Sequence, residues 1–138
     1  MKMNRNKERM NNERQIQALT RGEEEVMRIL WQLGDAVVNG IIDRMPEPRP
    51  KYTTVATFLK ILETKGFVAH TAEGKSHRYY PLIDRETYAR SVMSSMLTSY
   101  FDGSLVQLVS FFSRHEKISA AEQEEILEIV RNAKKSKA

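Results

Sequence analysis

Residues 50–82 constrain the fold more than any other part of the sequence. Their first half has the 3.6-residue periodicity of an amphipathic helix, which Gly66 ends. Their second half alternates as two strands, at 67–71 and 77–81, joined by a turn at 73–75. A helix leading into a basic hairpin is the arrangement of a winged helix-turn-helix. The apolar stripe expected to dock the helix consists of Val55, Phe58, Leu59 and Leu62.

The opposite face of this expected helix is small and basic, with Thr53, Thr57, Lys60 and Thr64 in line. Short side chains let a helix approach base edges, and threonine can donate to a phosphate, accept from a base or touch a thymine methyl group. Threonine is a poor helix former, so its repetition favours function, with a chance solvated face as the alternative. The residues predicted to contact DNA here are Lys51, Tyr52, Thr53, Thr54, Ala56, Thr57 and Lys60.

The tip of the hairpin is also basic. Lys75, Ser76 and Arg78 lie at or just beyond the turn, where a wing would contact the phosphate backbone or the minor groove. For any one of them, an ordinary solvated turn is the alternative. His70 and His77 lie on the two strands, but two histidines without cysteine or clustered carboxylates are a poor ligand set. We therefore predict no metal site.

The segment before residue 50 supplies helices against which the reading helix would pack. Thr20 and Glu23 form a capping box at the start of the first helix. Residues 37–38 fit a short strand at the base of the hairpin, and residues 41–45 fit a short second helix ended by Pro46. The first helix is expected to bury an apolar stripe of Val26, Ile29, Leu30 and Leu33, widened by Met27 and Trp31.

Basic residues concentrate at two places. Residues 1–14 carry five basic and two acidic side chains, residues 49–80 carry six and two, and residues 83–138 balance. This distribution matches the electrostatic footprint of a nucleic-acid-binding protein, with a solvated charged surface as the alternative. The chain has no cysteine and no apolar run long enough to span a membrane. We therefore predict a cytoplasmic protein without membrane insertion or thiolate metal sites.

Three further amphipathic helices are expected after residue 82, in about 50 residues, too few to enclose a core of their own. Their apolar faces need a partner. A second copy is the economical choice, because a two-fold dimer places two reading heads on two half-sites. Packing back on the N-terminal part is the alternative. The residues predicted to form the dimer interface are Tyr88, Val92, Met96, Tyr100, Leu105, Leu108, Val109, Phe112, Ile126, Ile129 and Val130.

These patterns predict a mainly α fold with a small β wing. The expected parts are a basic arm at 1–18, a winged-helix DNA-binding domain at 19–82, a helical dimerisation domain at 83–132 and a frayed tail at 133–138. The sequence has no nucleophile–base pair, phosphate-binding loop or H-E-x-x-H motif, and capping explains the carboxylates at helix starts. We predict no enzymatic activity and no cofactor. A winged helix that binds another protein instead of DNA is the competing class.

Several blocks of the sequence resemble the penicillinase repressor (BlaI/MecI) family. They are L-T-R-G-E-E-E-V-M-R-I-L-W at 19–31, Y-T-T-V-A-T-F-L-K-I-L-E-T-K-G-F-V at 52–68, Y-Y-P-L at 79–82, F-D-G-S-L at 101–105 and I-S-A-A-E at 118–122. Together they extend over residues 19–132. The resemblance implies a homodimeric repressor on an inverted-repeat operator in double-stranded DNA, with an N-terminal winged helix and a C-terminal dimerisation region.

The resemblance also implies DNA-contacting positions. Some family members have Arg where this chain has Ala56, which implies a different operator sequence here. The family's contacts from the reading helix fall on Thr53, Thr54, Ala56 and Thr57, and those from the wing fall on Lys75 and Arg78.

Release from DNA is a further implication of the resemblance. Family members are cleaved in the dimerisation region through a membrane-sensor metalloprotease pathway, which makes such a protease an expected partner. The corresponding bond here is Phe111-Phe112, and Phe111 replaces the Asn of the β-lactam-responsive members. β-Lactams are therefore not implied as the signal. The copper-responsive branch of the family uses C-terminal cysteines, which this chain lacks.

Overall fold

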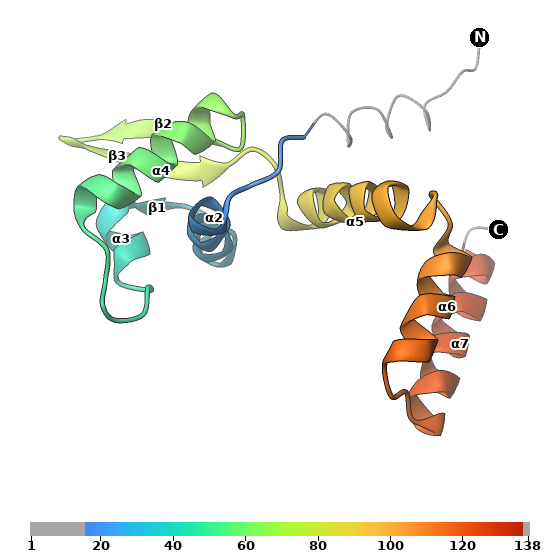
Figure 1. Cartoon of the computed structure of the whole chain (residues 1–138). Helices are drawn as coiled ribbons and strands as arrows, with labels where there is room; N and C mark the ends of the chain where they lie inside the picture. The colour runs from blue at the N-terminus through green and yellow to red at the C-terminus, as the bar shows by residue number, and fades with distance from the viewer. Residues whose placement is uncertain (1–15, 137–138) are drawn as a thin grey trace, which may run out of the picture. The chain divides into compact units, whose positions relative to one another are not determined.

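The computed structural model describes residues 16–136 and is mainly helical, with one small antiparallel sheet (Figure 1). The predicted fold class is confirmed. The chain divides into two compact units between Ser95 and Met96. Residues 1–15 of the expected arm and 137–138 of the expected tail lie outside the described residues. In chain order, the N-terminal unit contains α2 (Arg21–Leu33), β1 (Ala36–Val37), α3 (Val38–Ile42), α4 (Tyr52–Thr64), β2 (Val68–Glu73) and β3 (Ser76–Pro81).

Helix α2 begins and ends where its sequence predicts. The Thr20 hydroxyl accepts from the Glu23 amide at 3.4 Å, and the Glu23 carboxylate accepts from the Thr20 amide at 3.0 Å, which completes the capping box. Gly34 ends the helix with φ of 85°, a conformation that glycine adopts without steric cost. The helix buries Val26, Met27, Ile29 and Leu30, with Trp31 and Leu33 partly buried.

The two short elements after α2 are shifted towards the N-terminus relative to the prediction, β1 by one residue and α3, which was expected at 41–45, by three. Strand β1 pairs with β3 through Ala36 and Val37, not through residues 37–38. Val37 is extended and serves as the N-cap of α3, which ends at Ile42. Met45 follows the helix and is not part of it, yet its side chain is buried.

Helix α4 docks through the predicted stripe, in which Val55, Leu59 and Leu62 are fully buried. Phe58 is partly buried beside them. Gly22 of α2 lies so near the Phe58 ring that a Cβ there would be 2.5 Å from Phe58 Cζ. Since a real side chain cannot sit at that distance, glycine at this position permits the close approach of α2 and α4.

Strands β2 and β3 form the predicted hairpin, beginning near the expected residues and continuing to the turn. Their register runs from Val68 opposite Pro81 to Glu73 opposite Ser76, and Gly74 takes φ of 61° in the turn. The sheet order is β1-β3-β2. Because β1 pairs with only two residues of β3, the outer part of the hairpin extends as a two-stranded wing.

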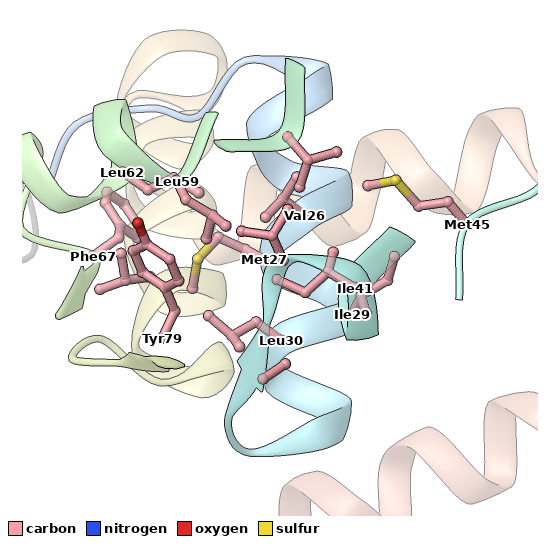
Figure 2. Packing of buried hydrophobic residues seen from close by; sticks show 14 of the residues in the cluster. Val26, Met27, Ile29, Leu30, Ile41, Met45, Leu59, Leu62, Phe67 and Tyr79 are labelled. Atoms are coloured by element: carbon pink, nitrogen blue, oxygen red, sulfur yellow. The ribbon is translucent and has the colours of Figure 1, made fainter. Parts of the chain in front are cut away.

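The core of the N-terminal unit lies between its helices and the hairpin (Figure 2). Met27 and Leu30 come from α2, Ile41 from α3 and Leu59 from α4, and Phe67 precedes β2; all five are fully buried. Each such side chain contributes about 1.5–3 kcal/mol through its removal from water. This core fixes α4 against α2 and leaves the opposite face of α4 free.

Helix α5 (Arg85–Phe101) begins as part of the N-terminal unit. Tyr88, which we predict for the dimer interface, is buried within the N-terminal unit, where it is 7% exposed. The centroid of its ring lies 5.5 Å from that of Phe67 and 6.0 Å from that of Trp31. Its hydroxyl accepts a hydrogen bond from the Leu19 amide at 2.9 Å. The N-terminal unit extends beyond the hairpin, through Ser95.

The C-terminal unit contains the end of α5 and the helices α6 (Leu105–His115) and α7 (Ala120–Ser136). Ser104 caps α6 by accepting from the Gln107 amide at 3.1 Å, and Ser119 caps α7 by accepting from the Glu122 amide at 3.1 Å. None of the described helices combines the length and apolar character that a membrane-spanning segment requires.

Candidate nucleic-acid interface

The face of α4 opposite the buried stripe is open to solvent. Thr53, Thr57, Lys60 and Thr64 are all exposed on it, as the helical periodicity predicts. Lys51, Tyr52 and Thr54 are exposed at its N-terminal end, and Ala56 is half-buried. The structure therefore brings the predicted reading residues together on one surface.

The N-terminal end of α4 differs from that of α2. Lys51 is its N-cap and makes no side-chain capping hydrogen bond, and no acidic residue lies in the first turn. The backbone carbonyl of Lys51 accepts from the amides of Thr54 and Val55. The positive end of the helix dipole is thus beside a lysine, and no carboxylate of the first turn compensates it. Such an end suits an anion such as phosphate.

Two threonine hydroxyls on the exposed face are already engaged as donors. Thr57 Oγ1 donates to the Thr53 carbonyl at 2.8 Å, and Thr64 Oγ1 donates to the Lys60 carbonyl at 3.1 Å. A hydroxyl has one proton, so these side chains are poorly placed to donate to phosphate. Their lone pairs can accept from a base amino group, and their methyl groups can touch a thymine methyl.

The wing presents Lys75 and Ser76 as exposed residues, but Arg78 is held by carboxylates. Its Nη1 lies 2.7 Å from Asp35 Oδ1 and its Nε lies 3.0 Å from Glu73 Oε2. Hydrogen bonds to Asp35 and then to Glu73 raise the pKa of Arg78 above its usual value. The sequence pattern did not indicate either partner.

A buried ion pair supports α4 from behind. The Lys65 ammonium lies 2.6 Å from the Glu23 carboxylate, whose side chain is 4% exposed. Burial would raise the pKa of Glu23, but the hydrogen bonds from Lys65 and from the Thr20 amide outweigh it and lower that pKa below its usual value. The sequence predicted Glu23 as part of a capping box, and Lys65 entered only the count of basic residues in 49–80. The contact between them depends on how α2 and α4 pack.

The two histidines of the hairpin stack on each other. Their ring centroids are 4.1 Å apart and the planes are 10° from parallel. His70 Nδ1 contacts the Glu63 carboxylate of α4, and His70 also lies beside the Tyr79 ring. Within residues 16–136, no group of three or more His, Cys, Asp or Glu side chains is arranged to hold a metal ion.

The other residues predicted for the dimer interface lie on α5, α6 and α7. Met96 and Leu108 are half-buried. The remaining side chains are 45–79% exposed: Val92, Tyr100, Leu105, Val109, Phe112, Ile126, Ile129 and Val130. This is far more exposed apolar surface than scattered single residues would give. It needs cover from another surface.

The candidate cleavage bond, Phe111-Phe112, lies within α6. The centroid of the Phe111 ring lies 5.5 Å from that of the Phe101 ring and 4.5 Å from that of the His115 ring. The bond is therefore part of a hydrogen-bonded helix, and its first residue sits in an aromatic cluster.

Comparison with known proteins gives consistent likenesses. A family model described as Penicillinase repressor matches residues 19–132. The chain is 28% identical to a penicillinase repressor of Bacillus licheniformis, over 90% of this chain and 98% of the relative. It is 29% identical to the methicillin resistance regulatory protein MecI of Mammaliicoccus sciuri, over 81% and 92%. The solution structure of the DNA-binding domain of the repressor BlaI is 30% identical, covers 53% of this chain and 90% of that domain, and aligns with a TM-score of 0.47.

Proposed function

This chain belongs to the penicillinase repressor family and is a DNA-binding transcriptional repressor, and we propose that it binds an inverted-repeat operator as a homodimer. The exposed face of α4 supplies the base contacts, and the start of α4 and the wing supply phosphate contacts. The relatives it matches are named as regulators and not as enzymes, so we propose no catalytic role and no cofactor. We propose that it acts on DNA in the cytoplasm.

The observation that carries this proposal is the division of α4 into two faces. One face is buried in the core through Val55, Leu59 and Leu62. The other is exposed and carries the short or basic side chains of Thr53, Thr57, Lys60 and Thr64. A reading helix needs both, because it must be rigidly docked and must also approach base edges closely.

Phosphate contacts are proposed for exposed cations around this helix. Lys60 lies on α4, Lys51 directly precedes its first residue, and Lys75 lies at the wing turn. Each phosphate neutralised releases condensed counterions, so the affinity should fall steeply with salt. Lys65 is excluded from this set because it is paired with Glu23.

The proposed homodimer forms through the exposed apolar side chains of α6 and α7, together with the end of α5. Burying apolar surface contributes about 25 cal/mol per Å². A second copy of the chain offers the same surface, which a two-fold interface can make self-complementary. Packing of these helices on the N-terminal unit of the same chain is the alternative, and a monomeric full-length chain would support it.

Cleavage at Phe111-Phe112 by a membrane-sensor metalloprotease pathway is the proposed route of release. Because the bond lies within α6, cleavage requires that helix to unwind locally. A new N-terminus at Phe112, found by mass spectrometry in induced cells, would support this route. An intact chain in cells that express the regulated genes would contradict it.

The test uses the full chain and fluorescent DNA duplexes of roughly 30 base pairs taken from the region upstream of its own gene. Affinity is measured by anisotropy at several salt concentrations. Lys60→Gln should flatten the dependence of log K on log salt by about one unit per reading head. Lys117→Gln, which removes an exposed lysine between α6 and α7, should leave the slope unchanged. Absence of salt-dependent binding would favour the protein-interaction module over the repressor.

A further inference from the structure

Arg78 connects three parts of the chain that meet at the base of the wing. It lies on β3, Asp35 lies in the turn between α2 and β1, and Glu73 is the last residue of β2. One guanidinium bonds both carboxylates, through Nη1 at 2.7 Å and through Nε at 3.0 Å. Charge-assisted hydrogen bonds of this kind are stronger and more directional than neutral ones.

Arg78 lies at the point along β3 where pairing with β1 ends, so its contacts can restrain the part of the hairpin beyond that point. Arg78 is opposite Val37, the last residue of β1, on one side and opposite Thr71 on the other. Beyond it towards the turn, β3 is paired only with β2. Arg78 therefore belongs to the last residue pair between β1 and β3 before the turn. Its guanidinium connects Glu73, near the tip of the hairpin, to Asp35.

The same contacts oppose a direct role in binding phosphate. The wing and its base hold two cations, Lys75 and Arg78, and two carboxylates, Asp35 and Glu73, so their formal charges cancel. A phosphate that approached Arg78 would have to displace or repel those carboxylates. Lys75 is exposed and carries no such restraint among the contacts of the described residues.

We propose that Asp35 and Glu73 make Arg78 a positioning residue that holds the wing in place, while Lys75 supplies the wing's phosphate contact. This proposal rests on the proposed function and refines it. It predicts that Arg78 affects affinity through the order of the wing and not through counterion release.

The first experiment measures the order of the wing without DNA. Amide hydrogen exchange of residues 71–76 in the free full-length chain should become about three- to five-fold faster in Arg78→Gln and in Asp35→Asn, the range set by a surface ion-pair network. Glu25→Gln removes the same charge as Asp35→Asn from an exposed position on α2 and should leave the exchange unchanged. Unchanged exchange in both wing variants would overturn the proposal.

The second experiment measures DNA affinity against salt for the same variants. Arg78→Gln and Asp35→Asn should each weaken operator binding about three-fold without changing the slope, and the double variant should bind no more weakly than Arg78→Gln. Lys75→Gln should flatten the slope by about one unit per reading head. An increase in affinity on Asp35→Asn, or a flatter slope on Arg78→Gln, would show that Arg78 meets phosphate directly. Failure of the unmodified chain to bind DNA would instead contradict the proposed function, leaving the exchange result to decide the role of Arg78.

Discussion

The Lys65 ammonium lies 2.6 Å from the Glu23 carboxylate and joins the residue after α4 to the first turn of α2. The same carboxylate accepts the Thr20 amide and completes the cap of α2. The Glu23 side chain thus caps the N-terminus of α2 and also holds the C-terminal end of α4, the helix that we propose reads DNA.

Replacement of Lys65 by Met should lower the free energy of unfolding by about 2 kcal/mol, because the alkyl stem is kept while the buried carboxylate loses its cation. Urea denaturation at pH 7 measures this loss. Lys60→Met, at an exposed position on the same helix, should change stability by no more than about 0.5 kcal/mol. Equal losses in the two variants would show that the ion pair adds nothing.

The lowered pKa of Glu23 predicts acid sensitivity. A carboxyl whose pKa is lower in the folded chain contributes stability above its unfolded pKa, and this stability is lost as the pH falls through the folded value. The free energy of unfolding should therefore decrease below about pH 4.5, the unperturbed value. Asp84, whose pKa is lowered by hydrogen bonds from Thr87, acts in the same direction. Glu23→Gln should lose less stability between pH 7 and pH 3 than the unmodified chain, and parallel pH curves would contradict this assignment.

Replacement of Gly22 by Ala tests the close approach of α2 and α4. Alanine usually stabilises a helix by about 1 kcal/mol relative to glycine, but here its Cβ would meet the Phe58 ring. We expect a net destabilisation of about 1–3 kcal/mol from overpacking, measured by thermal unfolding. Phe58→Leu in the same chain should recover part of the loss. A stabilised Gly22→Ala variant would mean that the ring moves aside freely.

Truncation at two points tests where the winged helix ends. A chain ending at Ser95 should fold and sediment as a monomer, because it lacks α6 and α7. A chain ending at Leu82 loses Tyr88, which covers Phe67 and Trp31. It should be less stable than the longer piece by about 3 kcal/mol. A dimeric 1–95 chain would place the dimer interface elsewhere, and equal stabilities would mean that Tyr88 contributes little.

Local sequence patterns predicted the elements that local physics determines. The stripe of α4, the capping box at Thr20 and the hairpin turn at Gly74 depend on residues close in sequence, and the structure contains them as expected. Strand β1 was displaced by one residue because it exists only through its pairing with β3. The packing of Tyr88 against Phe67 and Trp31 was not predicted, because an apolar stripe does not reveal which surface covers it.

Long-range polar contacts were beyond sequence reasoning for a similar reason. Arg78 and Asp35 are far apart in the chain, and nothing in the spacing of either residue indicates that they pair. Composition counted Arg78 as one more cation on a basic wing. The structure shows two carboxylates on that cation, which changes what the residue can be expected to do on DNA.

The most direct test of base reading is the ratio of operator affinity to random-DNA affinity in Thr57→Ala, compared with the unmodified chain and with Gln32→Ala as a control at an exposed position on α2. The Thr57 hydroxyl donates to its own helix, so its lone pairs and methyl group are what a base can meet. We predict about a five-fold loss on the operator, corresponding to about 1 kcal/mol for a base contact, with random-DNA affinity and the Gln32→Ala ratio unchanged. Equal losses on operator and random DNA would contradict base reading by this face of α4.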